Sequence, residues 1–182
     1  MNMRKTNLSD LTHIALFAAV MAVCSWISVP MTVPFTLQTF GVFLAVRLLG
    51  GKKGTVALML YMLLGLVGLP VFSGFKSGPA ALIGPTGGYL VGFFLISSLY
   101  WALEKKLENR FLKDAVLYAG LLLCYALGTA WFVYLMGLKG SQVSVGYALS
   151  VCVLPFMIPD FAKLVLSDLA ASQLTRALKR LR

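Results

Sequence analysis

Apolar residues form six long runs along the chain, separated by short polar segments. The runs cover residues 11–29, 35–49, 55–69, 83–103, 115–137 and 155–178. A helix that crosses a bilayer needs roughly 20 predominantly apolar residues, so each run predicts a membrane-spanning helix. The second and third runs are short, which favours little tilt or a locally thinned bilayer. A further apolar stretch, 143–154, is too short to span and predicts a partial helix that enters from one side.

The Lys and Arg residues between these runs predict the orientation of the helices. With the N-terminus inside, the outer connections hold only Lys76 and Lys139, and Lys163 lies within a span. The other basic residues all fall on inner segments: Arg4, Lys5, Arg47, Lys52, Lys53, Lys105, Lys106, Arg110, Lys113, Arg176, Lys179, Arg180 and Arg182. Cytoplasmic loops carry such an excess. We therefore expect an all-α integral membrane protein, a single domain over residues 1–182 with six transmembrane helices and both termini cytoplasmic.

Composition agrees with a lipid environment. The chain is 59% hydrophobic and 12% charged, whereas ordinary soluble domains carry about 25% charged residues. The net charge of +10 does not indicate nucleic acid, because the basic residues flank apolar runs and form no single basic face. The run 11–29 is long for a signal peptide, and no small-residue cleavage site follows it, so it predicts a first span.

The sequence contains no recognisable catalytic or metal-binding motif. The stretch Gly-Gly-Lys-Lys-Gly-Thr at 50–55 lacks the spacing of a phosphate-binding loop, and the one histidine, His13, lies far from the acidic residues of the last span. Cys24, Cys124 and Cys152 lie inside apolar runs without pairing or metal-type spacing. We expect no metal, no cofactor and no enzymatic activity, and ATP-driven uptake would require hydrolysis on a partner.

The outer connection 70–89 is unusually rich in glycine and proline. Irregular backbone is tolerated near a membrane only where it faces water or packs on protein. The segment is either a plain re-entrant turn or a lid over a cavity, whose glycines allow close backbone approach to a ligand. The second outer connection, 138–155, ends at the start of the last span. Both connections lie on the face where an imported ligand would arrive.

Asp160 and Lys163 are two charged residues near the outer end of the last span. Residues three apart share one helix face, and charges within a span usually face the protein interior or a wet cavity. The pair is either a structural ion pair or a grip for a polar ligand. As a joint acceptor and donor it suits a urea- or amide-like group.

Other polar residues on the outer side allow two interpretations each. Gln38 bonds neighbouring backbone or lines the cavity. Tyr89 covers a ligand or belongs to the aromatic belt at the interface. Lys76, in the lid, meets a ligand carboxylate or is simply solvated. Asp168, further along the last span, has no assigned role: it pairs with a basic residue of a partner or bonds to another helix.

The first span carries two pairs of small residues four apart, Ala15/Ala19 and Ala18/Ala22. Small residues at this spacing let another helix approach closely. The approaching helix belongs either to this chain or to another subunit.

Four motifs stand out in the sequence: Val-Pro-Phe-Thr-Leu-Gln-Thr-Phe-Gly at 33–41, Gly-Leu-Pro-Val-Phe-Ser-Gly-Phe at 68–75, Gly-Pro-Thr-Gly-Gly-Tyr at 84–89, and Pro-Phe-x-x-x-Asp-x-x-Lys at 155–163. Together they resemble the BioY family, the biotin-specific substrate-binding components of energy-coupling factor (ECF) transporters. One departure is Met-Ile-Pro at 157–159, where family members often have a glycine beside the aspartate. Proline suits the first turn of a helix, so we expect Pro159 to tighten the helix start.

This resemblance implies a six-helix fold that holds biotin near the outer surface. Asp160 and Lys163 match the grip on the ureido ring, Phe35 would pack on the thiophane ring, and the remaining matched residues would line or close the pocket: Gln38, Lys76, Gly87 and Tyr89. The alanine pairs match the surface for a transmembrane coupling (T) subunit joined to two ABC-type ATPases, in a bacterial or archaeal plasma membrane. The rival functions are capture of another vitamin, membrane-embedded catalysis through Asp160 or Asp168, and a purely structural subunit.

Overall fold

The computed structural model describes residues 8–180 and is almost entirely helical. Over this range the helices and strands follow one another in this order: α1 Leu8–Trp26, β1 Ser28–Val29, β2 Phe35–Thr36, α2 Gln38–Leu49, α3 Gly51–Leu66, η1 Ser73–Phe75, α4 Pro79–Ile83, α5 Gly87–Leu103, η2 Glu104–Lys106, α6 Arg110–Leu138, α7 Val145–Cys152 and α8 Leu154–Arg180. Three of the basic residues that were predicted to lie on inner segments, Arg4, Lys5 and Arg182, are outside the described residues.

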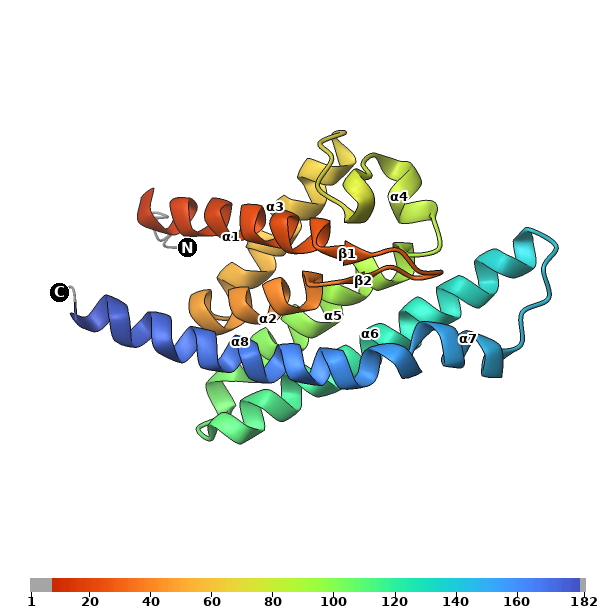
Figure 1. Ribbon diagram of the computed structural model, residues 1–182. Coiled ribbons are helices and arrows are strands. Elements are labelled where there is room, and N and C mark those ends of the chain that lie inside the picture. The colour runs from red at the N-terminus through yellow and green to blue at the C-terminus, as the bar shows by residue number, and fades with distance from the viewer. Residues whose placement is uncertain (1–7, 181–182) are drawn as a thin grey trace, which may run out of the picture.

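The long helices run back and forth between two ends of the bundle (Figure 1). One end, which we call the lid end, holds the β1–β2 pair, α4 and the connection from α6 to α7. The start of α1, the turn from α2 to α3, the turn from α5 to α6 and the end of α8 lie at the opposite end. Because α1 begins and α8 ends at the same end, the described chain has the arrangement of an even number of crossings.

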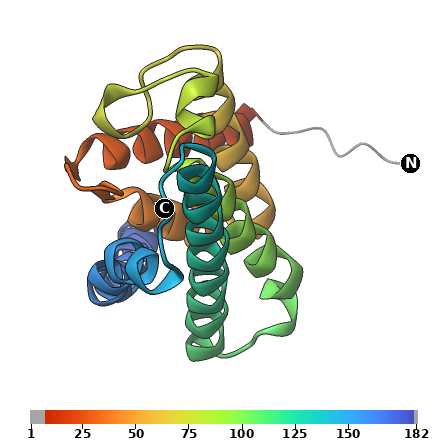
Figure 2. The same cartoon turned by 90° about the vertical axis from the view of Figure 1, so that its right-hand side faces the viewer.

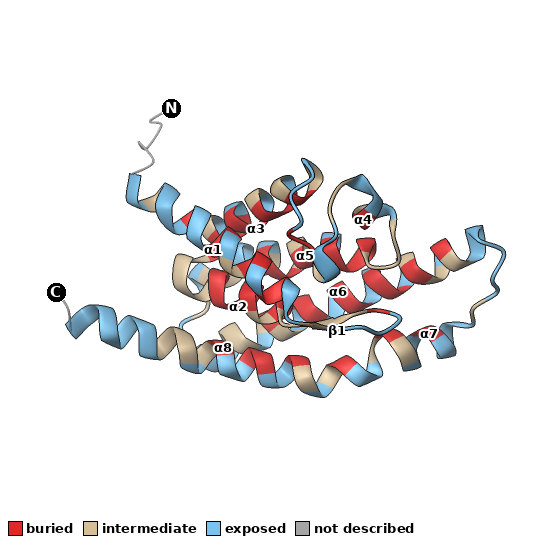
Figure 3. Cartoon of the chain, turned by 45° about the horizontal axis from the view of Figure 1, so that its top comes forward, coloured by how far each residue is buried: buried red, intermediate tan, exposed pale blue. Residues whose placement is uncertain are grey.

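Helix α2 lies in the interior, where it packs on α8, α3, α1 and α5. Val42, Phe43, Ala45 and Val46 are fully buried, and Figure 3 shows burial concentrated on α2, α3, α5 and α6, while the end of α8 is exposed. A helix of 12 residues is about 18 Å long, too short to cross hydrocarbon by itself. It is tolerated because protein rather than lipid surrounds it.

Helices α5 and α6 form the most extensive helix pair in the structure, seen edge-on in Figure 2. Glycines make the contact close: a Cβ on Gly120 would lie 2.8 Å from the Cα of Ile96, and one on Gly92 would lie 2.7 Å from the Cys124 Sγ. Small residues at such interfaces let backbones approach within van der Waals contact. This packing holds the start of α5 and the end of α6 together at the lid end.

The lid segment, residues 70–89, is held to α1 and α3. Trp26 donates from Nε1 to the Pro70 carbonyl oxygen at 2.8 Å, and its ring stacks on Phe75 at 5.3 Å between centroids. Ser25 donates to the Val71 carbonyl oxygen at 2.5 Å. The segment is therefore an ordered cover, built of η1, α4 and their connections, that rests on the end of the first helix.

Each predicted span overlaps a helix, but not every one of these helices is long and apolar enough to count as a membrane span. Within residues 8–180, three helical segments are long and apolar enough to cross a membrane: Leu8–Trp26, Arg110–Leu138 and Val145–Arg180. The others, α2, α3 and α5, are shorter than predicted spans commonly are. The partial helix expected at 143–154 is present as α7, Val145–Cys152.

Three boundaries were predicted wrongly. Residues 28–29 and 35–36 form an antiparallel strand pair, with Ser28 opposite Thr36, rather than helix; Pro30 and Pro34 between them disfavour helical backbone. The expected fourth span, 83–103, corresponds to α5, which begins later, at Gly87, and Ile83 belongs to the separate short helix α4. Pro159 lies inside α8, because the helix already begins at Leu154, so it is not a first-turn proline.

Candidate substrate-binding site

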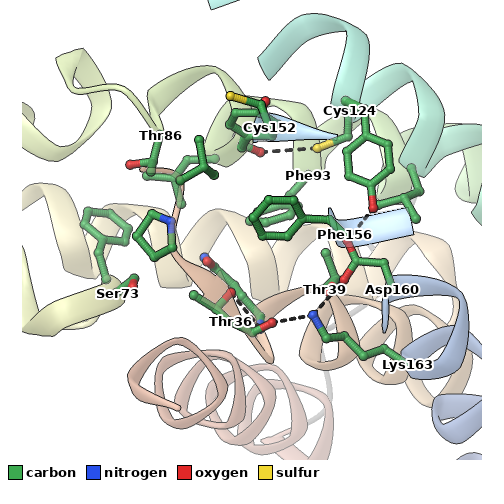
Figure 4. Close-up of a pocket in the computed structure, with 18 of the residues that line it drawn as sticks. Thr36, Thr39, Ser73, Thr86, Phe93, Cys124, Cys152, Phe156, Asp160 and Lys163 are labelled. Atoms are coloured by element: carbon green, nitrogen blue, oxygen red, sulfur yellow. Dashed lines mark hydrogen bonds and ion pairs between the residues drawn. The ribbon is translucent and has the colours of Figure 1, made fainter. Parts of the chain in front are cut away.

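A partly covered cavity of about 80 Å³ lies at the lid end, between the lid, β2 and the helices α2, α5, α6, α7 and α8 (Figure 4). It is smaller than ordinary small-molecule pockets, which measure roughly 300–1,000 Å³. Its wall is mixed. Aromatic and aliphatic side chains supply most of the surface, and a few polar groups converge on one side: Thr36, Gln38, Thr39, Asp160 and Lys163.

Asp160 and Lys163 meet at the floor of this cavity. Their side chains are 4% and 5% exposed, and Lys163 Nζ lies 2.6 Å from Asp160 Oδ1. Lys163 also donates to the Thr36 carbonyl oxygen at 2.5 Å. Asp160 accepts from the Thr39 hydroxyl at 2.9 Å and from the Tyr125 hydroxyl at 2.5 Å. Figure 4 shows both side chains turned towards Thr36 and Thr39.

The pair combines the two interpretations drawn from the sequence. It is a buried ion pair whose partners bind each other, and both members line the cavity. A buried pair is tolerable only when further hydrogen bonds satisfy it, and three hydrogen bonds, one each with β2, α2 and α6, do so here. A ligand placed in the cavity would have to share or replace these contacts, exchanging one set of charge-assisted hydrogen bonds for another.

Phe35 lies beside the pair and does not line the cavity. Lys163 Nζ is 3.9 Å from the centroid of the Phe35 ring, a cation–π contact, and Phe35 stacks on Phe156 at 6.1 Å between centroids. Phe156 does line the cavity. Phe156 therefore supplies the part of the aromatic lining that comes from α8, and Phe35 supports it from β2.

Gln38 links the cavity to the lid. Its Nε2 donates to the Tyr61 hydroxyl at 2.8 Å, and that hydroxyl donates to the Val71 carbonyl oxygen at 3.1 Å. Gln38 is buried and lines the cavity. Its amide bonds to a side chain of α3, not to the neighbouring backbone that was one of the two expectations.

The other predicted lid residues divide into two groups. Lys76 and Tyr89 line the cavity; the Tyr89 hydroxyl pairs with the Thr129 hydroxyl at 3.1 Å, inside the bundle. Gly87 lies outside the lining, buried at the start of α5. A Cβ there would lie 1.6 Å from the Leu82 carbonyl oxygen, so Gly87 allows α4 to fold back over α5.

Sequence reasoning missed several residues of the wall. Tyr125 binds Asp160 directly, and Phe93, Cys124, Cys152 and Phe156 line the cavity. Tyr125 carried a usable signal, because a hydroxyl in the middle of an apolar span needs a partner. The apolar and sulfur-bearing residues carried none, since they look the same as core residues.

The chain was compared with known protein families, sequences and structures. The sequence model of the BioY family matches residues 1–180. The chain belongs to the BioY family. It is 42% identical over 168 residues to the biotin transporter BioY of Thermotoga maritima, covering 92% of this chain and 96% of that protein. It is 37% identical over 178 residues to the biotin transporter BioY2 of Lactococcus lactis subsp. cremoris, covering 97% and 95%.

The fold comparison agrees. A crystal structure of the S-component for biotin from an ECF-type ABC transporter superposes with a TM-score of 0.83 at 25% identity, covering 97% of this chain and 95% of that one. Membership of the BioY family, together with the long apolar helices, makes this a membrane protein. It also confirms the expectation that the chain is not an enzyme, because the family consists of transporter components.

In this BioY family member the two alanine pairs lie on adjacent parts of the α1 surface and differ in burial. Ala18 and Ala22 are buried inside the bundle, so their close approach is to helices of the same chain. Ala15 and Ala19 are exposed on the outer face of α1. One pair therefore serves the internal packing, and the other is open to another subunit.

Asp168 lies at the end of the bundle opposite the lid end, where two arginines bind its carboxylate. Arg47 Nη1 donates to its Oδ1 at 3.0 Å, and Arg110 binds the same carboxylate through two nitrogens. Arg47 also meets Asp114 at 2.5 Å and the Ser167 hydroxyl at 3.1 Å. Asp168 thus pairs with arginines of its own chain, and the network joins α2, α6 and α8.

Proposed function

We propose that this chain captures biotin at the outer face of a bacterial or archaeal plasma membrane, as the substrate-binding component of an ECF transporter. The observation that carries the proposal is the Asp160–Lys163 pair at the floor of a mainly apolar cavity beneath a glycine-rich lid. The names of the relatives and of the similar crystal structure support biotin as the ligand.

The chemistry of biotin matches the cavity wall. Its ureido ring offers N–H donors and a carbonyl acceptor, which complement the Asp160 carboxylate and the Lys163 ammonium. The apolar thiophane ring suits the aromatic wall around Phe156, with Phe35 behind it. Lys76, at the lid, would meet the carboxylate of the valeryl chain, and Gln38 and Tyr89 would complete the polar rim.

Entry of biotin requires the lid to move and the cavity to expand beyond about 80 Å³. The lid is held by hydrogen bonds to Trp26 and Ser25 and through Tyr61, so a limited set of contacts controls access. Closing the lid over the ligand would exclude water and strengthen the charge-assisted hydrogen bonds at the floor.

The proposal includes six membrane crossings with both termini in the cytoplasm, which places the lid outside. The exposed Ala15/Ala19 face of α1 would meet a transmembrane coupling subunit, joined to two ABC-type ATPases that energise uptake. The internal course of the helices and the positive-inside distribution of Lys and Arg support this orientation.

The sharpest test removes both charges at once. Asp160→Asn alone would leave the Lys163 ammonium buried without its partner, which by itself is destabilising. The double variant Asp160→Asn/Lys163→Met leaves neither charge unpaired. Two charge-assisted hydrogen bonds, each worth about 1.5–3 kcal/mol, predict a loss of biotin affinity on the order of 100-fold or more, measured by calorimetric titration of purified protein.

Glu108→Gln is the matched control, an exposed charge on the loop before α6, and it should bind biotin as the unaltered chain does. If the double variant keeps its thermal stability and still binds biotin with full affinity, the pair is purely structural. A parallel titration with thiamin and riboflavin tests the ligand class, and tight binding of either in place of biotin would overturn the assignment.

A further inference from the structure

A second hollow lies at the end of the bundle opposite the lid. It is an open cleft of about 350 Å³ between the C-terminal half of α8 and the ends of α2, α5 and α6. Four cationic side chains line it, Arg47, Arg110, Lys113 and Arg176, and Asp168 is the one carboxylate among its lining residues. The cleft is remote from the biotin site and takes no part in the proposed capture.

Two of these cations are already neutralised and two are not. Arg47 and Arg110 bind Asp168, and Arg47 also binds Asp114. Among residues 8–180, Lys113 and Arg176 have no carboxylate within 4.0 Å. The arginine–aspartate network therefore occupies two of the four cations that line the cleft, and Lys113 and Arg176 remain without an acidic partner among residues 8–180.

The unpaired cations would provide most of the affinity for an anion. The Ser172 and Thr175 hydroxyls on the wall already donate to the carbonyl oxygens of Leu169 and Ala171, at 2.8 Å each. An anion would therefore take its hydrogen bonds from Lys113 and Arg176. Phosphate oxygens accept strong, charge-assisted hydrogen bonds from Lys and Arg side chains.

The position of the cleft indicates where the phosphate would come from. Lys113 immediately precedes the run predicted to cross the membrane, and Arg176 lies in the last turn of the final run. Apolar side chains beside them on the same helices are exposed: Phe111 74%, Leu112 47%, Leu169 49% and Leu174 45%. A cationic hollow next to an apolar, lipid-facing surface matches a headgroup with its acyl chains. Basic pockets between helices on the cytoplasmic side recognise acidic headgroups.

We propose that this cleft binds the phosphate headgroup of an anionic phospholipid of the cytoplasmic leaflet, through Lys113 and Arg176. With the membrane orientation proposed above, the single negative charge of the bound phosphodiester would offset part of the two remaining positive charges and would link the C-terminal half of α8 to the start of α6. Helices α6 and α8 make few direct contacts with each other.

The test compares lipids that differ only in headgroup charge. Native mass spectrometry of the full chain in a zwitterionic detergent is used to titrate dioleoyl phosphatidylglycerol against dioleoyl phosphatidylcholine. The unaltered chain should prefer phosphatidylglycerol. Lys113→Gln/Arg176→Gln should lose that preference by roughly tenfold or more, since each juxtamembrane cation contributes about fivefold. Lys105→Gln/Lys179→Gln, with the same change of charge at the same end, should keep it.

The contrary results lead to different conclusions about the cleft. Equal loss in both double variants would show general charge attraction and overturn the site. Displacement of the lipid by inorganic phosphate at equal concentration would assign the cleft to the free anion. If lipid preference is unchanged but co-purification of cytoplasmic ATPases is lost, the cleft is a protein contact. Unchanged melting temperatures establish that the variants are folded, so the result does not depend on biotin binding.

Discussion

At the scale of single residues, burial decides how much each charge matters. Arg47 and Lys53 are both basic residues near the same end of the bundle, and each binds an aspartate at 2.5 Å. The side chain of Arg47 is 7% exposed, whereas that of Lys53 is 43% exposed. The two ion pairs therefore have the same N–O distance, but the basic side chain is buried in one and exposed to solvent in the other.

Replacing Arg47 by Met should lower the free energy of unfolding by about 2–3 kcal/mol. The change leaves Asp114 without its partner and removes one of the two arginines on Asp168. A fully buried broken pair costs about 3–5 kcal/mol, and these carboxylates are partly exposed. Lys53→Met is the control and should cost under about 1 kcal/mol. Reversible unfolding in mixed detergent micelles measures both, and equal losses would contradict the argument.

Residue-scale prediction from the sequence succeeded where the partners lie on one helix. Asp160 and Lys163 are three residues apart, so helical geometry alone places them together. It failed where partners are distant in the chain. Asp168 lies 121 residues from Arg47, and no local pattern shows which arginine reaches it. Tyr125 was missed for the same reason, because its bond to Asp160 depends on how α6 and α8 cross.

At the scale of elements, glycine spacing controls how closely α5 and α6 pack. Gly120 faces the Ile96 backbone, and Gly137, on the same helix, has nothing within 4 Å of its would-be Cβ. Both glycines lie in α6. Replacing either one by alanine lowers the backbone entropy that is lost on folding by a similar amount, which favours the folded state by about 0.5–1 kcal/mol. The two substitutions differ only in what the new methyl group meets.

Gly120→Ala should destabilise the bundle, because overpacking costs about 1–3 kcal/mol and exceeds the gain in backbone entropy. Gly137→Ala should leave stability unchanged or slightly raised. Thermal unfolding followed by circular dichroism would show the difference. Equal melting temperatures for the two variants would mean that α5 and α6 separate without cost.

The elements themselves were largely predictable, and their ends were not. Apolar runs located the long helices because burial in lipid or protein requires continuous apolar surface. The runs at 11–29 and 35–49 hid a strand pair, since Val29 and Phe35 are as apolar as helix residues. The two-residue strands depend on the turn between Pro30 and Pro34, a feature that hydropathy does not register.

At the scale of the whole molecule, the two alanine pairs of α1 separate internal packing from outward contact. Ala19→Leu places a larger side chain on the exposed face without touching the core. The variant should bind biotin normally and fail to co-purify with the transmembrane coupling subunit. Ala126→Leu, an exposed alanine on α6, is the matched control and should retain the complex. Retention by both variants would exclude this face of α1 as the docking surface.

The three cysteines give the closed cavity a built-in reporter. Cys24, Cys124 and Cys152 are all buried, and the last two line the cavity. Because both thiols are buried, lifting of the cover should speed their alkylation by a water-soluble maleimide. The rate of labelling at Cys124 and Cys152 would therefore report openings of the lid, and protection by added vitamin would record occupancy without any engineered probe.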